Sequence, residues 1–265
     1  MSRREPASWN RRAVEWLDER LYPGVANRWD DSLLRERVLA LLRPSHTVLD
    51  LGAGAGIVPQ MDFRGRARSV CGVDPDPRVL DNPHLDEGRL GVGERVPWPD
   101  QTFDLAFADN VLEHLDDPES VFREVRRVLK PGGRFVVKTP NLCHYMPLVA
   151  RLSPTSFHRF VNRLRGRAVL DTFPTRYRTN TPAALRRHAA AAGLEIELVE
   201  RHEGRPEYLR LSPATYVAGW LYERSVNAFA GLEPFRLVLI ATLRRPTTTE
   251  EARDAHPAAQ RQLSA

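Results

Sequence analysis

The chain has only two cysteines, Cys71 and Cys143, and neither belongs to a CxxC pair or a histidine-rich cluster. This scarcity argues against a disulfide framework and a structural zinc site, so we expect two reduced, buried thiols. Long apolar runs are missing as well: nowhere do about 18 apolar residues follow one another. The basic first residues, MSRREPASWNRR, lead into no apolar segment of the kind that export requires. The sequence therefore predicts a cytoplasmic protein without a membrane span.

Short apolar runs alternate with helical patterns along the middle of the chain. The runs HTVLDLG, SVCGVDPD, FDLAFADN and GRFVVKTP are each too short for a helix and rich in Val, Leu or Phe, which is typical of buried parallel strands. Between the last two, Asp117 and Pro118 predict the start of a helix that ends at Gly132 or Gly133. Strands alternating with helices predict an α/β, Rossmann-like doubly wound sheet, with ligands outside the carboxyl ends of the strands.

We expect three regions along the 265 residues. Residues 1–44 form two N-terminal helices that act as a lid or anchor the core. Residues 45–245 form the sheet domain, with an insertion at about 141–180. Residues 246–265 have almost no apolar periodicity and are expected to be a disordered tail.

A glycine-rich turn, VLDLGAGAG, follows the first of these strands at residues 48–56. A side chain at Gly52 or Gly54 would occupy space that a ligand needs, although an ordinary tight turn has the same composition. The spacing G-x-G-x-G differs from the G-x-G-x-x-G of dinucleotide-binding turns and disfavours NAD. Asp74 ends the next strand, where its carboxylate can accept hydrogen bonds from both hydroxyls of an adenosyl ribose.

Four motifs in order over about residues 45–141 resemble those of class I S-adenosylmethionine-dependent methyltransferases, of the type 11, UbiE/UbiG-like group. They are VLDLGAGAG, GVDPD, VPWPDQTFDLAFADNVLEHLDDP and LKPGGRFVVKTPN. The resemblance implies a methyltransferase (EC 2.1.1.-) with S-adenosyl-L-methionine as its cofactor. It also implies a seven-stranded, mostly parallel sheet whose last strand is antiparallel, and FRLVLIATLRR stands in the right place for that strand.

The resemblance further implies a set of cofactor-binding residues. Gly52, Ala53, Gly54 and Gly56 would line the methionine portion, Asp74 would bind the ribose, Pro75 would contact adenine, Asp109 and Asn110 would lie beside the cofactor, and Asp50 would accept amide hydrogen bonds or face the ammonium group. One departure is that Val92 and Gly93 stand where many relatives carry an aspartate. Adenine recognition is therefore expected to depend on backbone groups around Gly93.

Methyl transfer needs an acceptor atom held in line with the methyl group, so a dedicated catalytic residue is optional. A hydroxyl acceptor would benefit from a general base, for which histidine is suited by its pKa. The candidates are His114, His144 and Tyr145. The alternatives are a structural role for His114, a surface loop position for His144, and apolar packing for Tyr145.

Acids are nearly absent between Asn141 and Asn180, where Asp171 is the only one. Seven arginines share this stretch: Arg151, Arg159, Arg163, Arg165, Arg167, Arg176 and Arg178. Arginine side chains suit phosphate and carboxylate groups, which predicts an Arg-rich cap over an anionic acceptor. In the alternative interpretation, these arginines pair with acids elsewhere or lie over the core.

These features together predict methylation of a small anionic molecule, with oxygen favoured over nitrogen or carbon as the acceptor. Candidate acceptors are a sugar, a lipid-linked glycan or a secondary metabolite. Aromatic residues among the arginines keep an RNA-directed methyltransferase as an alternative, but no RNA-binding module is recognisable. A second alternative is a non-catalytic, methyltransferase-like scaffold. The sequence contains no signature of a metal site and leaves the oligomeric state open.

Overall fold

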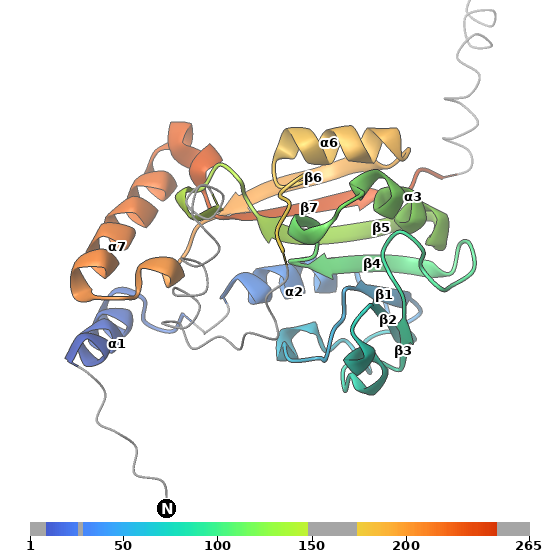
Figure 1. Ribbon diagram of the computed structural model, residues 1–265, viewed down its shortest axis with the longest axis horizontal. Coiled ribbons are helices and arrows are strands. Elements are labelled where there is room, and N and C mark those ends of the chain that lie inside the picture. Colours follow the sequence, from blue (N-terminus) through green and yellow to red (C-terminus); the bar gives the residue numbers. More distant parts are fainter. Residues whose placement is uncertain (1–8, 26–28, 148–173, 248–265) are drawn as a thin grey trace, which may run out of the picture. The chain divides into compact units, whose positions relative to one another are not determined.

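The computed structural model describes residues 9–25, 29–147 and 174–247, and Figure 1 shows their secondary structure. The chain divides into two compact units. The first, called the sheet unit below, comprises Asp31–Thr139, Thr175–Glu200 and Leu239–Ala265. The second, called the helical unit, comprises Met1–Asp30, Pro140–Pro174 and Arg201–Val238.

The sheet has seven strands in the order β3-β2-β1-β4-β5-β7-β6. Their bounds are Thr47–Leu51 for β1, Ser69–Asp74 for β2, Glu87–Leu90 for β3, Phe103–Asp109 for β4, Leu129–Pro140 for β5, Glu195–His202 for β6 and Val238–Arg244 for β7. Strands β3, β2, β1, β4 and β5 pair in parallel. Backbone hydrogen bonds join Arg245 to Gly133 and Asn141 to Leu237, so β7 runs antiparallel to β5. The predicted fold class is confirmed.

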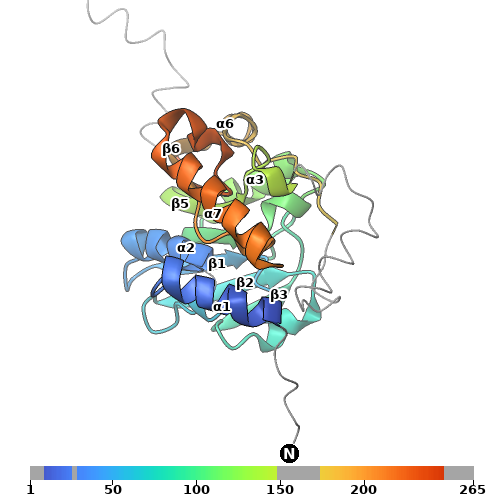
Figure 2. The same cartoon turned by 90° about the vertical axis from the view of Figure 1, so that its left-hand side faces the viewer.

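Helices cover both faces of this sheet (Figures 1 and 2). Helices α3 (Pro118–Val128) and α6 (Pro182–Ala191) lie together on one side, and α2 (Trp29–Leu41) lies on the other. Buried side chains of α3 and α6 form one core with alternate residues of the strands, because successive strand side chains point to opposite faces. Three short 3-10 helices follow strand ends: η1 (Pro59–Met61), η2 (Pro77–Asp81) and η3 (Leu112–His114).

Helix α3 begins as the sequence predicts, since the Asp117 carboxylate accepts a hydrogen bond from the Ser120 backbone N–H and Pro118 is the first helical residue. Its predicted end at Gly132 or Gly133 is wrong. The helix ends at Val128, and Leu129 already pairs with Phe103 as the first residue of β5. Burial of Leu129 beside the strand outweighs continuation of the helix toward the glycines.

The helical unit contains α1 (Trp9–Leu21), α7 (Pro213–Ala228), η5 (Glu207–Leu209) and η6 (Ala230–Phe235). Helices α1 and α7 lie side by side in both views (Figures 1 and 2). Val14, Tyr22 and Tyr216 form the buried contact between them. The hydroxyl of Tyr216 donates to Asp18 at 2.7 Å, and that of Tyr22 donates to Glu223 at 2.9 Å. These bonds satisfy the polar ends of both buried rings.

Two further expectations concern the cysteines and the membrane. Both thiols are free, but only Cys71 is buried; the expectation of a buried thiol is wrong for Cys143, which is exposed. In the part of the chain that the structure describes, no helix combines the length and the apolar character needed to cross a bilayer.

Candidate functional site

The glycine turn after β1 is left-handed at three positions, with φ of +83° at Gly52, +50° at Gly54 and +68° at Gly56. A Cβ atom at Gly52 would lie 2.3 Å from Val111, and one at Gly56 would lie 2.3 Å from the Asn82 amide oxygen. Both glycines are therefore required by packing as well as by conformation. At Gly54 the nearest described atom, an Asp74 carboxylate oxygen, would be 3.9 Å away, so the space above this residue is open.

Asp74, at the end of β2, holds this turn with its carboxylate. One oxygen accepts the Gly54 backbone N–H at 2.9 Å, and the other accepts the Asp76 backbone N–H at 2.7 Å. The carboxylate is partly buried and Pro75 beside it is exposed. Each carboxylate oxygen can accept more than one hydrogen bond, so Asp74 keeps capacity for ligand hydroxyls.

Asn82, which was not predicted as a site residue, also holds the turn. Its buried side-chain amide donates to the carbonyl oxygens of Ala53 at 2.9 Å and Gly54 at 3.2 Å. The amide oxygen accepts the His84 backbone N–H at 2.9 Å, which fixes the orientation of the side chain. No local pattern marks this asparagine, because its partners lie 28 and 29 residues earlier in the chain.

Asp50 lies beneath the turn with 6% of its surface exposed. Among the residues that the structure describes, no donor forms a hydrogen bond with its carboxylate. Burial raises the pKa of Asp50 well above its usual range, and the negative charges of Asp109 and Asp74 raise it further. A buried carboxylate with no partner is unstable in its ionised form unless a cation approaches. The Asp50 carboxylate would therefore be stabilised by a positively charged group of a ligand.

Asp109, at the end of β4, is already compensated. Its carboxylate forms an ion pair with the buried ammonium of Lys138 at 2.8 Å and accepts the side-chain amide of Asn110 at 3.0 Å. Lys138 also pairs with Asp31 of α2. Asn110 has φ of +53°, and its backbone N–H donates to the Lys138 carbonyl oxygen. Lys138 and Asp31 were not predicted, although a lysine inside the apolar run RFVVKTP is an unusual feature.

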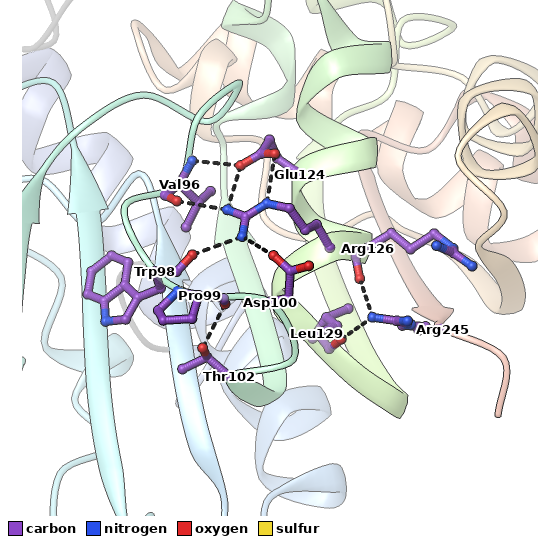
Figure 3. A network of polar contacts seen from close by, with 10 residues as sticks. Val96, Trp98, Pro99, Asp100, Thr102, Glu124, Arg126, Leu129 and Arg245 are labelled. Carbon is purple, nitrogen blue, oxygen red and sulfur yellow. Dashed lines mark hydrogen bonds and ion pairs between the residues drawn. The ribbon is translucent and has the colours of Figure 1, made fainter. Parts of the chain in front are cut away.

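The loop that contains Gly93 continues to Val96 and Trp98, which are hydrogen-bonded to α3 (Figure 3). The Arg127 guanidinium donates to the carbonyl oxygens of Trp98 at 2.9 Å and Val96 at 3.0 Å, and it pairs with Glu124 at 2.8 Å. Glu124 in turn accepts the Val96 backbone N–H. A Cβ at Gly93 would meet Val121 at 3.2 Å and Leu51 at 3.7 Å, which places Gly93 beside the carboxyl end of β1. Val92 points outward and is 45% exposed.

His114 is partly exposed at the end of η3, and its neighbour Glu113 is buried. Burial raises the pKa of Glu113 to about 7, while a hydrogen bond from the Thr139 hydroxyl at 2.9 Å favours ionisation. The backbone carbonyl of Glu113 accepts hydrogen bonds from Arg176 and Tyr177. Glu113 was not predicted as a site residue; its burial depends on tertiary packing that the motif VLEHL does not reveal.

His144 and Tyr145 belong to the helical unit, whereas His114 and all the predicted cofactor residues belong to the sheet unit. His144 is 1% exposed, so it is not a surface loop residue. Its Nδ1 accepts the Met146 backbone N–H at 3.1 Å, and its Nε2 lies 3.4 Å from the carboxylate of Glu203. Burial lowers the pKa of His144 to about 3 and raises that of Glu203 to about 8. The Tyr145 ring stacks on His144 at 4.0 Å between centroids.

The Arg-rich stretch lies mostly outside the described residues, since 148–173 are not described. Two of its arginines are placed. Arg176 forms an ion pair with Asp116 at 2.8 Å, and Arg178 donates to the Asp116 carbonyl oxygen at 2.6 Å. These two arginines thus have local partners. The predicted cap over an anionic acceptor and residues 248–265 of the predicted tail are outside the described residues.

Residues 49–137 match a family model described as a methyltransferase domain. Over 132 residues the chain is 33% identical to the uncharacterized methyltransferase YcgJ of Bacillus subtilis, which covers 46% of this chain and 49% of that protein. The matches with the curated relatives extend over 31% to 55% of their lengths. The family match confirms the resemblance drawn from the four motifs.

Solved structures with little sequence identity share the fold. The [4+2]-cyclase SpnF has a TM-score of 0.52 at 21% identity, covering 82% of this chain and 81% of that one. Geranyl diphosphate C-methyltransferase from Streptomyces coelicolor, solved with Mg²⁺, geranyl diphosphate and S-adenosyl-L-homocysteine, has a TM-score of 0.50 at 17% identity, covering 82% and 77%. These two structures support the architecture of the chain, not its reaction.

Proposed function

We propose, from the premise that residues 49–137 form a methyltransferase domain, that this chain is an S-adenosyl-L-methionine-dependent methyltransferase. The observation that carries the proposal is the pairing of open space above Gly54 with the uncompensated carboxylate of Asp50. An adenosyl sulfonium compound with an ammonium group matches both, since it would fill the space and neutralise the carboxylate. When bound, this cofactor supplies a methyl group that is already activated for displacement.

The remaining residues then have distinct proposed roles. Asp74 binds the ribose hydroxyls with the acceptor capacity that its two backbone hydrogen bonds leave. The exposed Pro75 and the backbone of Gly93 contact the adenine. Gly52, Ala53 and Gly56 shape the turn along the methionine portion, while Asp109 and Asn110, joined to Lys138, form a fixed wall at the end of β4.

For the acceptor we propose a small anionic molecule that is methylated on oxygen. The excess of arginine between Asn141 and Asn180 supports the anionic character. Of the three candidate bases, His114 lies in the sheet unit and keeps partial exposure, so it is the proposed base for a hydroxyl acceptor. His144, with a pKa of about 3, is a weak base, and with Tyr145 it is a proposed acceptor-side residue.

Carbon and nitrogen are the alternative methylated atoms. An RNA acceptor remains the second candidate substrate. Incubating the enzyme with methyl-labelled S-adenosyl-L-methionine and separate pools of small anionic metabolites and RNA would decide between them. Label in the RNA alone would overturn the small-molecule proposal.

The cofactor is tested by calorimetry with S-adenosyl-L-homocysteine. We expect the wild type to bind it and Asp74→Ala to bind at least about tenfold more weakly, because charge-assisted hydrogen bonds contribute about 1.5–3 kcal/mol each. The matched control is Glu36→Ala, which removes an exposed carboxylate from α2. Equal affinity in Asp74→Ala and Glu36→Ala would contradict the role of Asp74. A wild type that binds NADH but not the homocysteine compound would overturn the assignment.

A further inference from the structure

A cavity lies in the sheet unit at the end of the strands opposite the glycine turn. It has a volume of about 410 Å³, and its polar lining consists of Arg43, His46, Asp104, Lys130 and Arg134. His46 directly precedes β1, and Asp104 and Lys130 lie at the starts of β4 and β5. The glycine turn follows the other end of β1, so one strand length of about 17 Å separates the two places.

The lining has more positive than negative groups. Three cations, Arg43, Lys130 and Arg134, share it with one carboxylate, that of Asp104. The Asp104 carboxylate already has two partners: both oxygens accept the Lys130 ammonium at 2.8 Å, and one also accepts the Thr47 backbone N–H at 2.9 Å. Arg134 pairs with Glu197 at 2.8 Å, and the side chains of both residues are partly exposed. Arg43 has no carboxylate within ion-pair distance among the described residues, so its charge remains uncompensated.

His46 supplies a second polar group without a partner. Its Nδ1 is buried, and no described residue forms a hydrogen bond with it. Burial lowers the pKa of His46, the nearby charges of Arg43, Lys130 and Arg134 lower it further, and Asp104 opposes them. At neutral pH the histidine is therefore uncharged, and an anion entering the cavity would favour its protonation.

The other walls of the cavity are apolar. Ala40, Leu41, Leu42 and Pro131 contribute them. Ligand sites of this kind combine apolar walls with a few convergent polar groups, and volumes of about 300–1,000 Å³ suit small organic ligands. Guanidinium and ammonium groups favour phosphate because they donate several charge-assisted hydrogen bonds to its oxygens. The lining thus matches a molecule with a phosphate at one end and an organic body at the other.

We propose that this cavity is a binding site for a phosphorylated small molecule, separate from the cofactor site. Arg43 and His46 contact the phosphate, Lys130 and Arg134 contribute positive charge, and the apolar wall holds the organic portion. The site lies away from the carboxyl ends of the strands, so its occupant takes no part in methyl transfer. The inference does not depend on the proposed function, because it involves none of the cofactor residues.

Calorimetry with the full chain tests the site, using AMP, inorganic pyrophosphate and adenosine as probes. Saturating S-adenosyl-L-homocysteine is present so that AMP cannot enter the cofactor site. We expect AMP to bind and adenosine not to bind. We expect pyrophosphate to bind more weakly than AMP, because it lacks the organic portion that the apolar wall holds. Pyrophosphate binding as tightly as AMP would contradict that role of the wall.

Two variants remove the same charge from different places. Arg43→Gln should weaken AMP binding at least about tenfold through loss of a charge-assisted contact. Arg186→Gln removes an exposed charge from α6 and should leave AMP binding unchanged. Circular dichroism confirms that both variants are folded. AMP binding by the two variants is also compared without S-adenosyl-L-homocysteine, so that the test does not depend on cofactor binding.

Four results would overturn the site: no AMP binding at about 10 mM, far above the affinity range of specific ligands; equal weakening by Arg43→Gln and Arg186→Gln; adenosine binding as tightly as AMP; or loss of AMP binding when S-adenosyl-L-homocysteine is added. The last result would place AMP in the cofactor site.

Discussion

Asp50 shows how a single residue can favour ligand binding at the expense of stability. Its pKa is raised above the unfolded value by burial, so the folded state is favoured by a protonated Asp50 at low pH. As the pH rises from the unfolded pKa through the raised folded pKa, this advantage is lost. Above that window the folded protein contains a buried charge that lacks a partner until a cation binds.

We therefore predict opposite effects of Asp50→Asn on stability and on binding. At pH 8 the variant should have a higher free energy of unfolding than the wild type, since it removes a buried carboxylate whose pKa is raised by burial. The gain should shrink as the pH falls through the raised pKa of Asp50. Affinity for S-adenosyl-L-homocysteine should fall, because the ammonium loses its carboxylate.

Denaturant unfolding at several pH values and calorimetry measure these two effects. Glu36→Asn, at an exposed site, is the control for loss of a negative charge. An Asp50→Asn variant that is less stable than wild type at pH 8, yet binds the ligand normally, would show that Asp50 has a structural partner instead of a ligand.

Glu113 has a comparable pH dependence with a defined window. Its pKa is about 7 in the folded protein against 4.5 as the ordinary value, so stability should decline between about pH 4.5 and 7 as the buried carboxyl ionises. Glu113→Gln keeps an acceptor for the Thr139 hydroxyl and removes the ionisation. We predict equal stability of the two proteins at pH 4 and an advantage of the variant of about 3 kcal/mol at pH 8. A constant difference across this range, measured by urea unfolding, would refute the prediction.

At the scale of elements, the glycine turn depends on a clamp from a distant segment. Asn82→Ala removes the two hydrogen bonds to Ala53 and Gly54 and leaves their carbonyls without these donors. We predict faster amide hydrogen exchange over residues 52–56 and affinity for S-adenosyl-L-homocysteine reduced by about tenfold, as expected for two lost hydrogen bonds of about 0.5–1.5 kcal/mol each. Asn227→Ala, in α7, is the matched control. Unchanged exchange in the turn of Asn82→Ala would mean that its glycines hold the conformation alone.

The sequence predicted elements well where the signal is local. The glycine turn, the cap of α3 at Asp117 and the apolar runs of β1, β2, β4 and β5 depend on neighbouring residues, and all were predicted. The end of α3 was missed because burial of Leu129 in the sheet decides it. Asn82 and Lys138 were missed for the same reason: their partners come from segments far away in the chain, so no local pattern records them.

Residues 1–44 are predicted to act as a lid over the cofactor or to anchor the core. Helix α1 packs on α7 through Val14, Tyr22 and Tyr216, and its Asp18 accepts the Tyr216 hydroxyl. These contacts anchor α1 within the helical unit, and the lid at residues 1–44 stays a prediction. All proposed cofactor residues belong to the sheet unit.

Hydrogen exchange measured by mass spectrometry with and without S-adenosyl-L-homocysteine tests this. We predict slower exchange at residues 50–56, 74–75 and 91–94, and no change in α1. As a control, AMP is added to the Arg43→Gln variant under the same conditions. It should not slow hydrogen exchange in these segments further. Strong protection of residues 9–21 by the homocysteine compound would instead favour the lid.

The position of β7 between β5 and β6 affects the order in which the protein can be assembled during translation. The ribosome makes β6 before β7, so β6 has no adjacent partner in the sheet when it emerges. Until β7 is synthesised, the nascent sheet has a free edge at β5, and free strand edges promote pairing with other chains. A chain whose translation stops before Val238 would therefore be prone to aggregation and would be expected to bind chaperones.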